Sequence, residues 1–200
     1  MAAERRVAMH WVKTMHALRR SPSAQHFRRH EHSRRVAELA EAVALLLELP
    51  HSEVTRIRRA ALLHDVGNAG IPEEILLKPG PLTESEFCYI KEHVHRGTRD
   101  FGAVKALRDA VPIVRHHHER VDGNGYPAGL AGDAIPIGAR VIAAADAYVM
   151  MTADVPWRAA KSHDEAIDEL RASAGTHLDE DVVNRLVGIL RERHQGNGAQ

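Results

Sequence analysis

The sequence is short of cysteine, aromatic residues and net charge, and each shortage excludes something. Its single cysteine, Cys88, excludes an intrachain disulfide and fits a reducing compartment. Aromatic residues make up 4%, so Leu, Ala, Val and Ile must fill the core. Lys plus Arg and Asp plus Glu number 27 each, and this balance argues against binding of a nucleic-acid polymer through bulk electrostatics.

Long apolar runs are also missing. No segment approaches the roughly 20 apolar residues that a membrane-spanning helix needs, and the first residues lack the apolar stretch of a secretory signal. We therefore expect a cytoplasmic protein without membrane association. A chain of 200 residues with 44% hydrophobic content fits one globular domain, or one domain with an appendage.

Apolar residues recur at helical spacing almost throughout, and no alternating strand pattern of useful length appears, so the predicted fold class is all-α. Residues 1–22 hold an amphipathic helix and a break; this segment could pack on the body, join a dimer or continue an upstream domain. The main domain is expected over residues 23–195, followed by a frayed tail over 196–200. Its helices are expected at about 27–49, 52–65, 83–97, 103–120 and from 137, 162 and 179 onward. Four caps are predicted: Ser52, Asp179, and the capping boxes of Thr83 with Glu86 and Ser162 with Glu165. Pro112 is expected to kink the helix over 103–120.

The stretch from Ala60 to Pro72 runs from an apolar helical segment into His64-Asp65, after which glycines break the helix. A carboxylate at a buried helix end is costly unless it is paired or coordinates a metal. His and Asp together supply ligands that iron, manganese or zinc accept. The alternative is a helix end whose histidine meets the last carbonyls while Asp65 caps a turn.

The sequence holds 15 histidines, and several of them lie beside apolar helix faces. His32 and His93 each fit a hydrogen-bonded core or surface histidine as well as a ligand. Asp146 follows three alanines and is either buried with a partner or exposed. The three consecutive residues His116 to His118 fan out at about 100° steps on a helix, so spacing alone does not tell which two can share an ion.

These ligand-type residues lie on separate helices, and a helical bundle brings such positions together at its centre. The candidates are His32, His64, Asp65, His93, Asp146 and two of the three consecutive histidines. Seven candidates exceed the four ligands of a tetrahedral zinc, so the count predicts two divalent ions with a bridging carboxylate. Such a pair can hold a hydroxide and stabilise in-line displacement at phosphorus.

Six motifs carry a family resemblance. They are His64-Asp65-Val66-Gly67, Ile71-Pro72, Leu77-Lys78-Pro79-Gly80, His117-His118-Glu119-Arg120, Asp122-Gly123-Asn124-Gly125-Tyr126-Pro127 and Ile135-Pro136. In this order and spacing the chain, from about Phe27 to Leu190, resembles the HD-GYP family, a branch of the HD phosphohydrolase superfamily known for bacterial cyclic di-GMP phosphodiesterases. The resemblance implies an HD-superfamily helical bundle with a long ordered Gly-Tyr-Pro loop. It also implies hydrolysis of a cyclic dinucleotide, cyclic di-GMP first, by a metal-bridged hydroxide.

The resemblance also implies residue roles. The first metal site would be His32, His64, Asp65 and Asp146, and the second would take His93, His117 and His118 with Asp65 as the bridge. Similar enzymes use two divalent ions, iron or manganese. His64 and Asp65 would be catalytic. Substrate binding and the shape of the site fall to Asn68, Gly125, Tyr126, Pro127 and Arg158. A homodimer or a regulatory signalling protein is the other kind of partner considered.

The chain departs from the family pattern at four positions. Asn68 stands where the family commonly has a lysine, and Val155 stands for the arginine of its Arg-Pro-Tyr motif. Val149 replaces a second aspartate, and Arg28 replaces an acidic residue of members that bind a third ion. Two of these changes remove phosphate contacts. The competing hypotheses are therefore a weak or inactive signalling module, and an HD phosphohydrolase that acts on another nucleotide.

Overall fold

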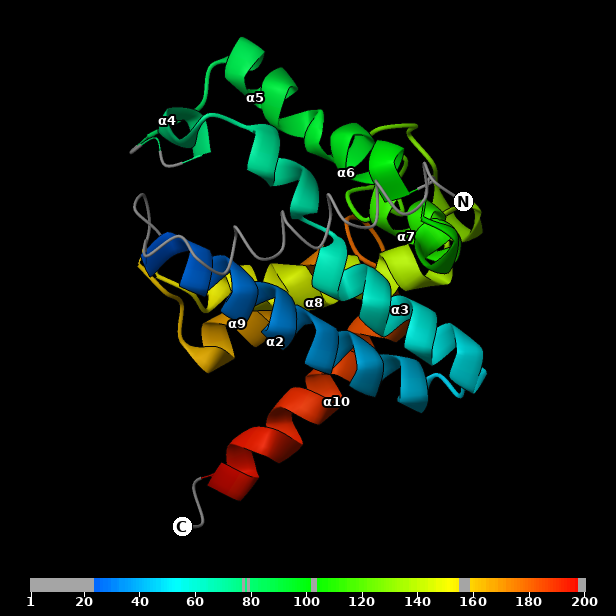
Figure 1. Ribbon diagram of the computed structural model, residues 1–200. Helices are drawn as coiled ribbons and strands as arrows, with labels where there is room; N and C mark the ends of the chain where they lie inside the picture. Colours follow the sequence, from blue (N-terminus) through cyan, green and yellow to red (C-terminus); the bar gives the residue numbers. More distant parts are fainter. Residues whose placement is uncertain (1–23, 77, 79, 102–103, 155–158, 198–200) are drawn as a thin grey trace.

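The computed structural model describes residues 24–76, 78, 80–101, 104–154 and 159–197 (Figure 1). The predicted helix near the N-terminus, Val155, Arg158 and residues 198–200 lie outside these ranges. The all-α prediction is confirmed for the described residues, where extended pairing is limited to two isolated bridges, Asp122–Ala131 and Ala174–Leu178. None of the described helices combines the length and the apolar character needed to cross a bilayer.

The body of the fold is built on two long helices and a central one. Helix α2 (Ala24–Leu46) packs on α3 (His51–Leu63), and both pack on α8 (Ile137–Met151). Helices α9 (His163–Ser173) and α10 (Glu180–Asn197) complete this part and pack on α8 (Figure 1). The core between them is aliphatic, as the scarcity of aromatic residues predicts; Ile57, Ile142 and Leu186 are fully buried in it.

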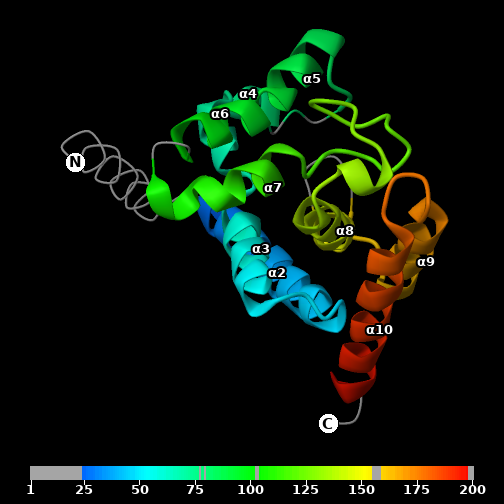
Figure 2. The ribbon, with the colours of Figure 1, turned by 90° about the vertical axis from the view of Figure 1, so that its right-hand side faces the viewer.

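A second group of shorter helices covers the end of α3 where His64 lies. It consists of η1 (Val66–Gly70), α4 (Glu73–Leu76), α5 (Glu84–Lys91), α6 (His93–Phe101), η2 (Lys105–Ala110) and α7 (Val111–Arg115). Figure 2 shows α4, α5 and α6 above α7, and α8 between this group and α9 and α10. An irregular segment with the short turn η3 (Gly132–Ala134) then leads from α7 to α8.

Three of the four predicted caps are present, and two of the predicted helices are interrupted. Thr83 and Ser162 form capping boxes with Glu86 and Glu165, and the Asp179 carboxylate accepts from the Val182 amide at 3.0 Å. The helix expected over 83–97 is broken between α5 and α6, and the one expected over 103–120 is η2 followed by the short α7. Proline lies in the first turn of α7, where its missing amide hydrogen is tolerated, and it does not kink a longer helix.

Helix α2 begins and ends three residues earlier than predicted, the N-cap of α3 lies two residues earlier, and α10 ends later. The predicted cap Ser52 is wrong: the N-cap of α3 is Pro50, whose carbonyl accepts from the Glu53 and Val54 amides, and no side chain caps this helix. Helix α10 continues to Asn197, two residues into the predicted tail.

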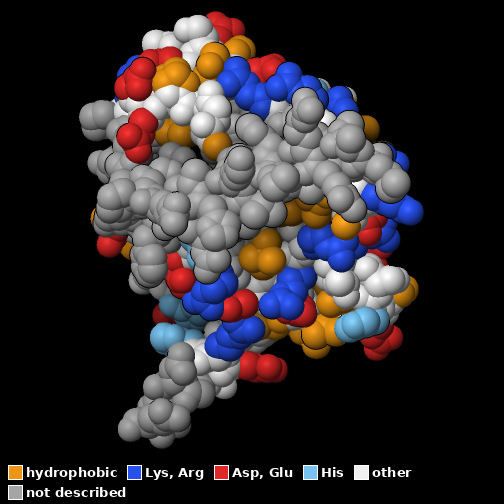
Figure 3. All heavy atoms as spheres, in the orientation of Figure 1, with side chains coloured by type: hydrophobic (Ala, Val, Ile, Leu, Met, Phe, Trp, Pro, Cys, Tyr) orange, Lys and Arg blue, Asp and Glu red, His pale blue; other side chains and the backbone are white. Residues whose placement is uncertain are grey.

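Charged side chains of both signs alternate on the exposed surface of the long helices. Figure 3 shows Lys and Arg side chains next to Asp and Glu on this face, without one sign prevailing. Arg34 pairs with Glu31 and Glu38 within α2, and Arg58 of α3 reaches Glu41 of α2 at 3.2 Å. These exposed pairs contribute little to stability, and they leave the interior contacts to position the site.

Candidate metal centre

His64 and Asp65 lie where α3 ends and η1 begins, and the glycine after them fixes their surroundings. A Cβ at Gly67 would lie 2.0 Å from the His93 carbonyl oxygen, so only glycine lets η1 approach α6 this closely. The helix break after His64-Asp65 therefore brings this pair next to His93. Of the helix-end alternative, the histidine part is confirmed, since His64 Nδ1 lies 2.8 Å from the Ala61 carbonyl oxygen, but the Asp65 side chain forms no cap hydrogen bond at the start of η1.

Three histidines of the site are almost fully buried and share one arrangement. His64, His93 and His117 are 1%, 2% and 1% exposed. In each, Nδ1 lies within hydrogen-bond distance of a backbone carbonyl three residues earlier: Ala61 at 2.8 Å, Ile90 at 2.9 Å and Val114 at 2.7 Å. A carbonyl can only accept, so Nδ1 carries the proton and Nε2 keeps its lone pair.

The three Nε2 atoms are buried and have no hydrogen-bond partner among the described residues. A buried polar atom without a partner is unfavourable, and three together at one centre are best explained by a group that they bind. A neutral imidazole with a fixed Nδ1–H is the form in which histidine binds a metal ion. The side chains present thus fit a metal ion by their own hydrogen bonding.

The ligand-type atoms gather in two groups joined by a third. His32, His64 and Asp146 form the first group, and His93, His117 and His118 form the second; within each, the ligand atoms lie within 4.8 Å of one another. His64, Asp65 and His117 form a third group that links the two. The side chain of Asp65 is 36% exposed and sends one oxygen each way: Oδ2 lies 3.6 Å from His64 Nε2, and Oδ1 lies 3.7 Å from His93 Nε2.

Asp146 is paired, which decides between the two alternatives for it. Its Oδ1 lies 2.9 Å from His32 Nε2 and 3.8 Å from His64 Nε2. Burial alone would raise the pKa of Asp146, but the hydrogen bond to His32 and the neighbouring ring of His64 lower it to about 2. Burial alone would lower the pKa of His32, but the bond to Asp146 raises it above the usual value. Asp146 is therefore a carboxylate that is ready to bind a cation.

The protonation states of Asp65, His117 and His118 suit cation binding as well. Burial would raise the pKa of Asp65, but the neighbouring rings of His64 and then His93 bring it below the usual value. Burial, and then the neighbouring His118, hold the pKa of His117 well below its usual range. Burial and then His93 lower the pKa of His118 to about 3. Near neutral pH the centre therefore presents two carboxylates and the neutral imidazoles of His117 and His118.

The irregular segment over residues 121–136 folds back on the second group. The Tyr126 ring stacks on the His118 ring, with centroids 4.8 Å apart and planes at 23°, and the Tyr126 amide donates to the His118 carbonyl at 3.2 Å. A Cβ at Gly125 would lie 2.4 Å from the backbone nitrogen of Arg120, so glycine is required for this close approach of the two backbones. The peptide bond from Tyr126 to Pro127 is cis.

Glu119 anchors this segment, a role that sequence reasoning missed. Its side chain is fully buried. Oε1 accepts from the Ala128 amide at 2.7 Å, and Oε2 accepts from the Leu130 amide at 3.1 Å. Glutamate in this position was visible only as part of the His-His-Glu-Arg motif, which gives no sign of what the carboxylate contacts.

Lys91, which sequence reasoning also missed, brings a positive charge to the same loop. Its Nζ lies 4.5 Å from the Phe87 ring centroid and 5.5 Å from that of Tyr126. Phe87 is 43% exposed and meets Tyr126 edge to face. Helical spacing places Phe87 and Lys91 one turn apart on α5, but nothing in the sequence places that turn against residues 121–136.

The remaining candidates for substrate binding have separate outcomes. Asn68 has a buried side-chain oxygen without a hydrogen-bond partner among the described residues. Val149 is part of the aliphatic core, 1% exposed, so the position offers no polar contact. Arg158 and Val155 lie outside the described residues, as does the side chain of Arg28.

A family model described as an HD domain matches residues 19–182. A cyclic di-GMP phosphodiesterase of Thermotoga maritima is 37% identical over 165 residues, covering 82% of this chain and 45% of the relative. A 3'3'-cGAMP-specific phosphodiesterase of Vibrio cholerae is also 37% identical, over 158 residues, covering 78% of this chain and 30% of the relative. The chain thus spans less than half the length of these curated relatives.

Among solved structures, an HDG"Y"P protein from Bdellovibrio bacteriovorus superposes with a TM-score of 0.67 at 20% identity. The superposition covers 82% of this chain and 52% of the other. Similarity at that identity concerns the fold, and it agrees with the helical arrangement described above.

Proposed function

The chain belongs to the HD-GYP family of HD domains, and we propose that residues 23–195 form a metal-dependent phosphodiesterase that opens a cyclic dinucleotide, with cyclic di-GMP as the first candidate. One observation carries the proposal: Asp65 sends one oxygen toward His64 of the first group and the other toward His93 of the second. A carboxylate between two sets of ligands can bind two divalent ions at once, and such a pair can stabilise displacement at phosphorus.

We assign the first ion to His32, His64, Asp65 and Asp146, and the second to His93, His117, His118 and Asp65. The mixture of imidazole and carboxylate suits iron or manganese. When bound, such ions supply an activated water and neutralise charge that develops on a phosphate. The chain's own residues orient the ligands: the carbonyls of Ala61, Ile90 and Val114 hold the three imidazole rings with Nε2 facing the centre.

Substrate contacts are assigned to the residues around the centre. Tyr126, held by its stack on His118, shapes the second half of the site together with Gly125 and Pro127. Asn68 offers a hydrogen bond where the family commonly has the charge of a lysine. Lys91 supplies a positive charge near the same loop, and the exposed ring of Phe87 offers a surface on which a nucleobase can stack. Arg158 stays a candidate for a phosphate contact.

Metal removal and reconstitution test this function. Protein treated with a chelator should lose cyclic di-GMP hydrolysis, and reloading with Mn²⁺ or Fe²⁺ should restore it. Chromatography of the product measures the hydrolysis. Asp65→Ala should lose both ions, measured as metal content per chain, and all hydrolysis. Asp168→Ala, an exposed aspartate on α9, is the matched control and should change neither. Hydrolysis by metal-free protein would contradict the proposal.

Two observations favour a second candidate, a signalling module with weak or no turnover. Asn68 carries no charge, and Val149 is buried in the core. Wild-type turnover of about 1 per second or faster would exclude the inert alternative. If the wild type is slow, restoring the phosphate contacts with Asn68→Lys and Val155→Arg should raise the rate; an unchanged rate would show that these positions do not limit it.

The 3'3'-cGAMP-specific relative bears on the choice of substrate. It is as identical to this chain as the cyclic di-GMP phosphodiesterase is, so identity alone does not separate the two dinucleotides. Hydrolysis rates for cyclic di-GMP, 3'3'-cGAMP and mononucleotides, measured under one set of conditions, will rank them. A preference for mononucleotides would overturn the cyclic-dinucleotide assignment while keeping the metal centre.

A further inference from the structure

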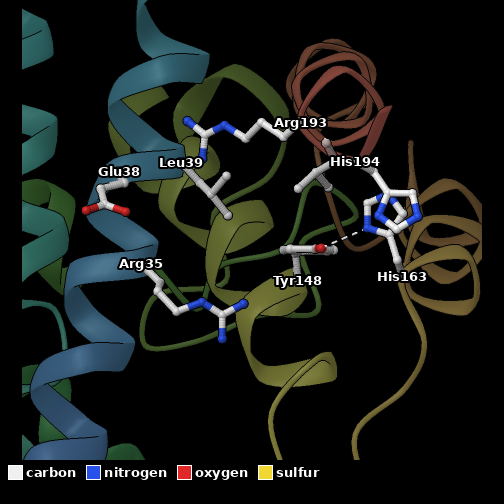
Figure 4. A pocket seen from close by; sticks show the side chains of 8 residues that line it. Arg35, Glu38, Leu39, Tyr148, His163, Arg193 and His194 are labelled. Atoms are coloured by element: carbon white, nitrogen blue, oxygen red, sulfur yellow. Dashed lines mark hydrogen bonds between the residues drawn. The ribbon is translucent and has the colours of Figure 1, made fainter. Parts of the chain in front are cut away.

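A cavity of about 210 Å³ lies between α2, α8, α9 and α10. None of its lining residues belongs to the two His/Asp groups. They are Arg35, Glu38, Leu39, Tyr148, His163, Leu190, Arg193 and His194 (Figure 4). The cavity shares helices with the metal centre, since Arg35 follows His32 by about one turn of α2.

The lining carries two guanidinium groups that form no ion pair with a carboxylate of the described residues. Within the described part of the chain, Arg35 makes one hydrogen bond, a long one of 3.4 Å to the Thr152 hydroxyl, and Arg193 makes no ion pair or hydrogen bond. Figure 4 shows Arg35 extending from α2 and Arg193 extending from α10, so that the two reach toward the cavity from different helices. Glu38, the one acidic residue of the lining, pairs with Arg34 and points away in this view.

Two histidines form the opposite side of the cavity, and their rings are held in place. The Tyr148 hydroxyl lies 3.0 Å from His163 Nδ1, and the His163 ring stacks on the His194 ring with centroids 4.5 Å apart and planes at 18°. This contact joins the start of α9 to the end of α10 over α8. The imidazoles are thus pre-positioned, with little rotamer freedom left to lose when a ligand binds.

The floor of the cavity is apolar, which strengthens the attraction of the guanidinium groups for an anion. Leu39, Tyr148 and Leu190 are 5%, 9% and 4% exposed. Charges beside such a surface are less screened than charges in open water. Guanidinium groups that approach from two helices, together with imidazoles on a third side, suit an anion with oxygens in several directions. The volume holds a phosphate group but is too small for a whole dinucleotide.

We propose that this cavity is a second binding site, specific for a phosphate group that Arg35 and Arg193 hold against the stacked pair His163 and His194. The ligand is inorganic phosphate or the terminal phosphate of a linear nucleotide. The proposal does not depend on the reaction at the metal centre.

Calorimetric titration of the metal-loaded protein with inorganic phosphate tests this site. Arg193→Gln removes one charge from an exposed position, so the fold should persist, and circular dichroism will check it. We expect the variant to bind phosphate about tenfold more weakly or worse. Arg191→Gln, an exposed arginine of α10 outside the lining, is the matched control and should bind as the wild type does.

The same titration distinguishes this cavity from the metal centre. Phosphate binding that survives His117→Ala but weakens in Arg193→Gln supports the cavity, whereas binding lost in His117→Ala and unchanged in Arg193→Gln overturns the proposal. A second variant, His194→Asn, should weaken binding as well, and wild-type affinity in both cavity variants would also overturn it. Titration with GMP then identifies the source: competition with phosphate assigns a nucleotide 5'-phosphate, and absence of competition assigns free phosphate.

Discussion

Replacing Glu119 by alanine should loosen the segment that carries Tyr126. The Glu119 carboxylate is buried and accepts from the Ala128 and Leu130 amides at 2.7 and 3.1 Å. A hydrogen bond to a charged group contributes about 1.5–3 kcal/mol. Because water can reach part of the freed backbone, the lower figure applies to each bond, and the loss should be about 3 kcal/mol. In a domain of this size that lowers the melting temperature by about 6–12 °C.

Thermal unfolding followed by circular dichroism measures this change, and two variants calibrate it. Glu119→Gln keeps the volume and one acceptor oxygen, so it should lose about half as much stability or more. Glu192→Ala, an exposed glutamate on α10, should leave the melting temperature unchanged. A loosened segment also releases the stack of Tyr126 on His118, so hydrolysis by Glu119→Ala should fall by about 10–100-fold.

A small effect on both measurements would refute this reasoning. If Glu119→Ala melts within about 2 °C of the wild type and keeps full activity, then other contacts hold residues 121–136. If it melts lower but hydrolyses normally, the segment is anchored as described but does not contribute to the reaction.

Three further predictions concern other parts of the molecule. Gly67→Ala should force η1 away from α6, because its Cβ would lie 2.0 Å from the His93 carbonyl oxygen, and the metal content per chain and the melting temperature should both fall. The hydrogen bond to Lys78 is the main reason why the pKa of Glu86 is lowered to about 2. This contact therefore stabilises the fold at a pH above the ordinary carboxyl pKa, and the stabilisation is lost as the pH falls toward 2. An NMR titration of the carboxyl group should show a higher pKa for Glu86 in Lys78→Ala than in the wild type. Lys91→Ala should raise KM for the dinucleotide and leave kcat nearly unchanged, as steady-state kinetics will show, because its charge acts in binding.

Sequence reasoning succeeded where a side chain's position follows from its own helix. Helical periodicity placed His32 on the core-facing side of its helix, and His32 lies in the first group. For Asp146 it left burial and exposure open, and the pairing with His32 decides between them. The capping boxes at Thr83 and Ser162 depend on residues three apart, so they too are local and were predicted correctly. The all-α class follows from the same local signals.

Contacts between distant segments were out of reach for the same reason. The carboxylate of Glu119 meets amides nine and eleven residues later, in a segment without periodicity. Lys91 approaches Tyr126 only because α5 packs near residues 121–136. The stacked pair of His163 and His194 joins two helices whose relative placement no sequence pattern gives. Such contacts depend on tertiary packing, and the sequence alone does not show which distant residues meet.

The buried histidines show that a helix-end role and a metal-ligand role for His64 are compatible. Ala61, Ile90 and Val114 each lie in the last turn of their helix, α3, α5 or α7, where carbonyls have no donor from a continuing helix. A histidine just beyond such an end can donate Nδ1–H to one of these carbonyls, which is the ordinary helix-end role. The same bond fixes the ring and leaves the Nε2 lone pair facing the centre.

The end of each helix therefore supplies the carbonyl that orients the histidine ring for metal binding. Gly67 indicates in the sequence that the helix before it ends near His64. No such signal precedes His93, because the apolar spacing from Phe87 to Val94 predicts one continuous helix. The break between α5 and α6 gives His93 the same bond to the carbonyl three residues back as His64 and His117 have. A substitution that restored a continuous helix across Glu92 should therefore impair metal binding even with every ligand in place.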